Sequence, residues 1–225
     1  YNGLNPIADL VMLKRLFSLL TLTSLMLVLP VHATPLLQAV AANDLAAVQN
    51  ILQNPAQAGL LEVRDELGRT PLLLATDHNR IAIARALIAA GANVNAKDSR
   101  QDSPYLLAGA QGRLEILKMT LAHGADLGST NRYGGTALIP AAERGHVAVV
   151  RTLIDAGVKV DHVNRLGWTA LLEAIILADG GTRHQEIVRM LIAAGADVNL
   201  ADKDGVTPLQ HALRRNYTAM ATMLR

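Results

Sequence analysis

The chain has no cysteine and very few aromatic residues. Without cysteine it cannot form disulfides, thiolate metal sites or a cysteine nucleophile, and it cannot carry a lipid on an N-terminal cysteine. Only 3% of its residues are aromatic although 51% are hydrophobic, so its core must be built from Ala, Leu, Ile and Val. Side chains of this size suit small helices that pack closely against one another.

Strong net charge and the common catalytic motifs are also missing. The formal net charge is only +2, which gives no electrostatic case for binding nucleic acid. The sequence contains neither a nucleophile elbow nor a phosphate-binding loop, and its histidines form no His-x3-His or HExxH pair. We therefore expect no catalytic residues, no metal site and no cofactor.

The N-terminal region has the three-part pattern of a secretory signal peptide. Lys14 and Arg15 form a short basic segment, residues 16–29 are uncharged and mostly apolar, and Ala33 stands just before Thr34. Because the apolar run is shorter than the ~20 residues that span a bilayer, the pattern predicts cleavage after Ala33. We expect a periplasmic or secreted protein that has no membrane contact once the signal is removed.

Met12 begins this pattern, so residues 12–33 are the predicted signal peptide. Residues 1–11 add nothing that a signal peptide needs, and we interpret them as upstream sequence or a misplaced start. The alternative is an uncleaved Leu16–Leu29 segment that would tether the protein to a membrane.

A five-residue phrase recurs along the rest of the chain. It first runs from Gly68 to Leu72, and its counterparts begin at Gln101, Gly134, Gly167 and Gly205. The interval is 33 residues, except for a last interval of 38. A fixed period of this length indicates a protein built from stacked repeats.

Each repeat carries the signals of two short helices. Thr70 can cap a helix and Pro71 suits its first position, which predicts a helix over 72–77. A second helix is expected over 81–90, and Gly91 ends it with the left-handed conformation that glycine adopts readily. One such unit cannot bury its own apolar face, so neighbouring units must stack.

This unit resembles the ankyrin repeat, whose signature is Thr-Pro-Leu-His-x-Ala, and the resemblance covers residues 34–225. It implies an all-α fold, an α-solenoid of about six ankyrin repeats that each contain a turn and two antiparallel helices. The expected repeats are 34–66, 67–99, 100–132, 133–165, 166–203 and an incomplete one at 204–225.

Three departures from the family pattern carry structural expectations. Apolar side chains such as Leu73 replace the signature histidine, so we expect apolar packing to replace the hydrogen bonds that this histidine makes in the family. Pro140 lies inside a predicted first helix, near its start. Repeat five has five extra residues around 178–184, between its helices, and its two adjacent glycines suggest a flexible loop.

In ankyrin-like stacks the turn tips and the first helices line a concave face, and the resemblance places partner contacts there. Trp, Tyr and Arg are the residue types enriched in interface hot spots. An alternative for Trp168 is that it stacks on a neighbouring tip and only stiffens the array. The predicted partner-binding residues are Arg69, Arg100, Asp102, Arg132, Tyr133, Arg144, Arg165 and Trp168.

These observations together predict a monomeric, non-catalytic module that binds another protein on its concave face, in the periplasm or outside the cell. No partner among nucleic acids is expected. A second hypothesis is a small-ligand or metal-dependent activity in the inserted loop of repeat five, where Asp179 and the two glycines lie. A third is the membrane-tethered binding module described above.

Overall fold

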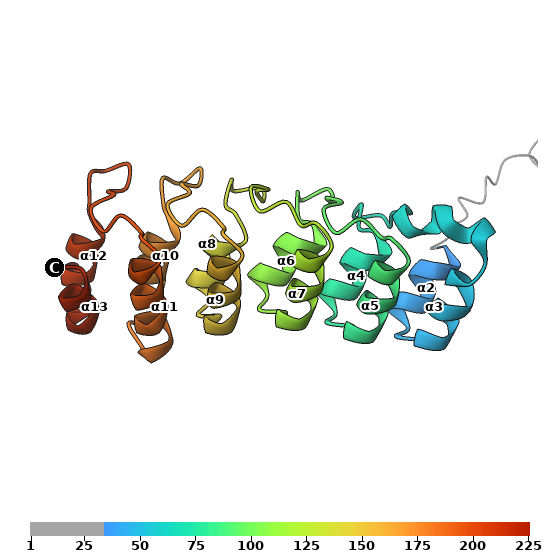
Figure 1. Cartoon of the computed structure of the whole chain (residues 1–225). Helices are drawn as coiled ribbons and strands as arrows, with labels where there is room; N and C mark the ends of the chain where they lie inside the picture. Colours follow the sequence, from blue (N-terminus) through green and yellow to red (C-terminus); the bar gives the residue numbers. More distant parts are fainter. Residues whose placement is uncertain (1–33) are drawn as a thin grey trace, which may run out of the picture. The chain divides into compact units, whose positions relative to one another are not determined.

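The computed structural model describes residues 34–225, apart from the side chains of residues 55–58. This part of the chain contains twelve α-helices, one 3-10 helix and no strand, which confirms the predicted all-α solenoid (Figure 1). None of its helices has the length and hydropathy needed to cross a bilayer. The predicted signal peptide, the Met12 start and residues 1–11 lie outside the described residues.

The helices come in six pairs within residues 34–225, one pair in each predicted repeat. The first helices are α2 (Pro35–Ala41), α4 (Pro71–Asp77), α6 (Pro104–Ala110), α8 (Leu138–Glu143), α10 (Ala170–Ile176) and α12 (Pro208–Arg214). The second helices are α3 (Leu45–Leu52), α5 (Ile81–Ala89), α7 (Leu114–Ala122), α9 (Val147–Asp155), α11 (Thr182–Ala193) and α13 (Thr218–Met223). The 3-10 helix η1 (Pro55–Glu62) follows α3.

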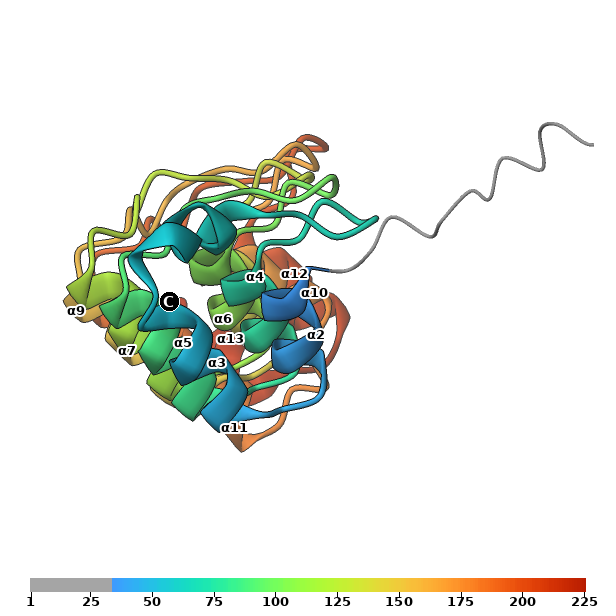
Figure 2. The ribbon, with the colours of Figure 1, turned by 90° about the vertical axis from the view of Figure 1, so that its right-hand side faces the viewer.

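Two layers of helices form the stack. Each first helix packs on the second helix of its own repeat and on the first helices of the neighbouring repeats. Figure 2 shows the first helices on one side, the second helices on the other and the connecting hairpins along one edge. The core lies between the layers, and the residue two positions after the Thr or Ser of the recurring phrase is buried in each of the first five repeats: Leu36, Leu72, Tyr105, Leu138 and Leu171.

Hydroxyl caps begin four of the first helices. The side chains of Thr70, Ser103, Thr169 and Thr207 each accept a hydrogen bond from the backbone N–H three residues later. Such a cap is worth about 1 kcal/mol. The capping Thr or Ser of the recurring phrase thus sets where these first helices start.

Pro140 changes this arrangement in α8. Elsewhere the corresponding N–H bonds the carbonyl of the cap residue, as Leu74 bonds Thr70 over 2.9 Å. Pro140 has no N–H, so the Thr136 carbonyl accepts from Ile139 instead, over 3.3 Å. The Thr136 hydroxyl is buried and has no hydrogen-bond partner among residues 34–225. The proline therefore removes one cap and shifts the start of α8 without breaking the helix.

An Asp or Asn side chain closes each hairpin tip. The Asn131 Oδ1 atom accepts hydrogen bonds from the backbone N–H of Tyr133 (2.9 Å) and of Gly135 (3.1 Å). Asp65, Asp98, Asn164 and Asp202 bind their own tips in the same way. This closed turn needs one residue in the left-handed region, at φ 73° for Gly134. In repeat three Gln101 occupies that position at φ 65°.

Gln101→Gly is expected to raise the free energy of unfolding by up to about 1 kcal/mol. The left-handed conformation costs a residue with a Cβ about 1–2 kcal/mol, and the greater entropy of glycine in the unfolded chain offsets part of that gain. Urea denaturation measures the difference. The matched change is Gly134→Ala, which should destabilise because its Cβ would lie 2.9 Å from the Arg165 Cγ atom. A loss of stability in Gln101→Gly would show that this tip is not strained.

Polar bonds link successive hairpins. The Arg64 guanidinium donates to the Lys97 carbonyl (2.6 Å), and the Lys97 ammonium donates to the Thr130 carbonyl (2.8 Å). Further along, the Arg165 guanidinium donates to the Arg132 carbonyl over 3.0 Å. The expectation that apolar packing alone replaces the missing histidines was therefore incomplete, because cations and carbonyls spaced 33 residues apart also tie the repeats together.

Three of the five extra residues of repeat five extend a helix, so the insertion forms a loop only in part. α11 begins three residues before the position that is equivalent to the start of α9. Residues 182–184 therefore form an additional turn at the start of α11. The Asp179 carboxylate accepts from the Gly181 N–H (2.8 Å) and lies 3.2 Å from the His184 ring. The other His184 nitrogen lies 2.9 Å from the Glu143 carbonyl oxygen, which anchors the turn on the preceding repeat.

Candidate binding groove

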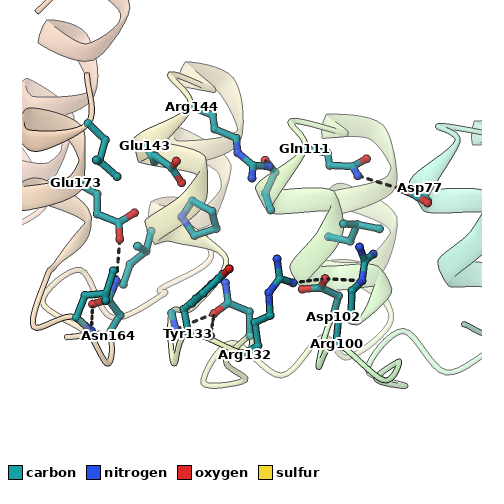
Figure 3. Close-up of a pocket in the computed structure, with 18 of the residues that line it drawn as sticks. Asp77, Arg100, Asp102, Gln111, Arg132, Tyr133, Glu143, Arg144, Asn164 and Glu173 are labelled. Carbon is teal, nitrogen blue, oxygen red and sulfur yellow. Dashed lines mark hydrogen bonds and ion pairs between the residues drawn. The ribbon is translucent and has the colours of Figure 1, made fainter. Parts of the chain in front are cut away.

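A groove of about 520 Å³ lies between the hairpin tips and the first helices of repeats two to five. The tips form one wall, and α4, α6, α8 and the end of α10 form the other, as Figure 3 shows for its labelled residues. The side chains of this groove divide into an exposed apolar row, a group of arginines and a pair of glutamates.

The apolar row comes from equivalent positions of the tips. Leu67, Tyr133 and Leu166 each precede the left-handed glycine of their turn, and each is about half exposed, at 51–53%. Leu177, at the end of α10, is 49% exposed and also lines the groove. Large apolar side chains that are held open to water by a rigid turn offer area for a partner to bury.

Arg132 and Arg100 lie beside Asp102 on the tips. The Arg132 Nη1 atom is 3.1 Å from the Asp102 Oδ2 atom, and the Arg100 Nε atom is 3.8 Å from the same oxygen. The Arg132 guanidinium also lies over the Tyr133 ring, 4.7 Å from its centroid. Burial raises the pKa of Asp102, while the charge of Arg132 lowers it. Both arginines remain about half exposed, so they keep N–H donors for a partner.

Arg69 and Arg144 also line the groove, but their bonds within the protein hold them more tightly. Arg69 pairs with Asp65 (2.7 Å) and with Asp77 (3.0 Å) and is mostly buried. The Arg144 guanidinium donates to the Ala110 carbonyl over 2.7 Å. The structure thus brings six of the eight predicted contact residues to one groove: Arg69, Arg100, Asp102, Arg132, Tyr133 and Arg144.

The other two predicted residues, Arg165 and Trp168, are not among those that line the groove. Arg165 is exposed and reaches back across the tip of the preceding repeat to the Arg132 carbonyl. Trp168 is half-buried, and its backbone N–H donates to the Asn164 Oδ1 atom over 3.0 Å. Its position in the tip is the one that Arg69 and Asp102 occupy in the groove.

Glu173 is a groove residue that sequence reasoning missed. It lies on α10, where Leu107 stands two repeats earlier, and it is only 5% exposed. Burial raises the pKa of this carboxyl to about 7, and the charge of Glu143 raises it as well. The Asn164 amide, which donates to the Glu173 Oε1 atom over 2.7 Å, and the charge of Arg144 oppose the shift. The available signal was a charged residue at a position that is apolar in repeats two to four.

Leu67 and Leu166 also occupy turn tips, but they were not among the predicted contacts, because leucine is not one of the residue types that dominate interface hot spots. Within residues 34–225 no group of three or more His, Cys, Asp or Glu side chains is arranged to hold a metal ion.

Comparison with known proteins identifies relatives of the whole stack. A family model described as "Ankyrin repeats (3 copies)" matches residues 12–98 and 105–202. A solved ankyrin repeat domain from Acinetobacter baumannii AYE is 62% identical, covers 84% of this chain and 95% of its own chain, and superposes with a TM-score of 0.81.

Two further proteins are similar. The solved ankyrin repeat protein EF0377 is 45% identical with a TM-score of 0.81, over 84% of this chain and 96% of that one. A putative ankyrin repeat protein of Escherichia coli K12, YahD, is 47% identical over 53 residues, which is 24% of this chain. The match spans about a quarter of the length of that curated relative, 26%.

Proposed function

This chain belongs to the ankyrin repeat family, and on that premise we propose that it is a monomeric module that binds another protein in the groove on its concave face. Ankyrin repeats generally mediate protein–protein interaction, and ankyrin repeat proteins are typically non-catalytic. We infer that the partner binds in this groove from the residues that line it. We propose neither a catalytic activity nor a nucleic-acid partner.

The observation that carries the proposal is the apolar row on the groove wall. Six large hydrophobic side chains are about half exposed within the described residues, and four of them, Leu67, Tyr133, Leu166 and Leu177, line this groove. The half-exposed guanidiniums of Arg100 and Arg132 lie beside them. Apolar anchors surrounded by charged donors are typical of interface centres. Arg165 and Trp168 stay proposed contacts, as a continuation of this surface beyond the groove.

Leu166→Ala is expected to weaken partner binding by about tenfold or more, because a buried interface anchor is worth about 1.4 kcal/mol or more. The partner is first captured by crosslinking in the native compartment, and its affinity for purified variants is then measured. Val163→Ala is the matched control, since Val163 is 46% exposed in the same hairpin but does not line the groove. Equal losses in both variants would remove the groove from the proposal.

We also propose that the protein is exported and acts in the periplasm or outside the cell. The pattern of a basic segment, an apolar run and Ala33 supports this. N-terminal sequencing of the protein from its producing cell is expected to start at Thr34. A retained 16–29 segment would instead favour the membrane-tethered form.

A further inference from the structure

The end of the groove between α8 and α10 carries two carboxylates without a cation of their own. Glu143 comes from the last turn of α8, and its side chain makes no hydrogen bond or ion pair within residues 34–225. Glu173 is bound only by the neutral amide of Asn164. Both line the groove, and the charge of Glu143 acts on Glu173 (Figure 3). The Glu143 carboxylate therefore disfavours the ionised form of Glu173.

The cations nearby are engaged elsewhere. The charge of Arg144, the residue after α8, lowers the pKa of Glu173, but its guanidinium donates to the Ala110 carbonyl. On the next repeat, His211 of α12 lies 2.7 Å from the Asp202 carboxylate. No ion pair within the described residues neutralises Glu143 or Glu173. This end of the groove is therefore complementary to a positive charge.

The same end is bordered by exposed leucines. Leu177 follows Glu173 by one helical turn, so both lie on one face of α10. Leu166 is two residues after Asn164, whose amide holds Glu173. A group bound to the carboxylates would lie in the same groove as these two leucines. This surface is complementary to a positively charged group on a flexible chain that has apolar residues beside it. A lysine or arginine side chain within a polypeptide has these properties.

We propose that the Glu143–Glu173 end of the groove binds a lysine or arginine side chain of the partner polypeptide, with apolar residues of the same segment on Leu166 and Leu177. The inference rests on the proposed function and specifies the chemistry of the partner. The cation relieves the repulsion between the carboxylates and forms charge-assisted hydrogen bonds with them. Because the site needs ionised glutamates, binding strengthens as Glu173 loses its proton.

The test selects peptides from a random twelve-residue library, displayed on phage, against the purified protein at pH 8. The expected sequences share a Lys or Arg with apolar neighbours. Replacing that Lys by norleucine, or that Arg by citrulline, should weaken a synthetic peptide by about tenfold or more. Glu143→Gln and Glu173→Gln should weaken it similarly, with unchanged circular dichroism, while the exposed Glu115→Gln should not.

The pH profile separates direct binding from a structural effect. For the unmodified protein the dissociation constant should rise several-fold between pH 8 and pH 6, and this change should vanish in Glu173→Gln. Peptides without a basic residue, or binding that ignores both glutamate variants, would overturn the inference, and so would a failure to select any peptide. Displacement of the peptide by micromolar spermidine would show a site for free polyamines instead. A different result would contradict the proposed function: unchanged binding of the captured partner by the Leu166→Ala variant.

Discussion

Glu173→Gln is expected to raise the free energy of unfolding by about 3 kcal/mol at pH 8, and to change it little at pH 4. The native pKa of about 7 lies above the ordinary value of 4.5 for a glutamate. A raised native pKa means that this carboxyl stabilises the fold when protonated, and that the stability is lost as the pH rises from about 4.5 through 7. Glutamine stays neutral and can still accept the Asn164 hydrogen bond.

Urea denaturation between pH 4 and pH 8 measures this difference. The curve of the unmodified protein should fall through the neutral range relative to that of Glu173→Gln. Glu115→Gln is the control, because Glu115 is exposed and pairs only with exposed Lys118. Two parallel curves would show that Glu173 titrates like an ordinary surface carboxyl. They would contradict the raised pKa of this buried acid.

Leu138→Ala is expected to cost about 3 kcal/mol and to divide the unfolding of the stack into two steps. Leu138 is fully buried at the start of α8, and truncating a buried leucine to alanine typically costs 2–5 kcal/mol. In a stack of repeats each unit is held mainly by its neighbours. A weakened central repeat therefore uncouples the repeats before it from those after it.

The matched variant is Leu36→Ala, which makes the same change at the equivalent position of the first described repeat, where the leucine is also fully buried. There the loss should loosen only that repeat, and the main transition should stay cooperative. Fluorescence of Trp168, the single tryptophan, reports repeat five, while hydrogen exchange reports each helix. Identical unfolding profiles for the two variants would contradict nearest-neighbour stabilisation.

The helices could be predicted because their signals are local. Thr70 and Pro71 mark a helix start and Gly91 marks an end, and the structure places α4 and α5 between them. The links between hairpins could not be predicted in this way. Nothing in the repeat shows that the long side chain of Arg165 reaches back to the Arg132 carbonyl, since a flexible stem takes its direction from the packed neighbours.

The groove was partly predictable for the same reason. Arg132 and Tyr133 occupy a turn tip whose position follows from the 33-residue period. The burial of Glu173 depends on how α8 and α10 approach each other, which the period leaves open. The extra turn of α11 escaped prediction because Gly180 and Gly181 suggested a loop, whereas Asp179 and His184 hold a helix start.

The most direct test of the binding groove is site-specific photocrosslinking in the cells that make the protein. A photoreactive amino acid replaces Leu166 in the groove or, as the control, exposed Lys118 on α7, in the layer of second helices. The proposal predicts a crosslinked partner from position 166 and none from position 118. A partner captured equally from both positions, or only from position 118, would contradict it.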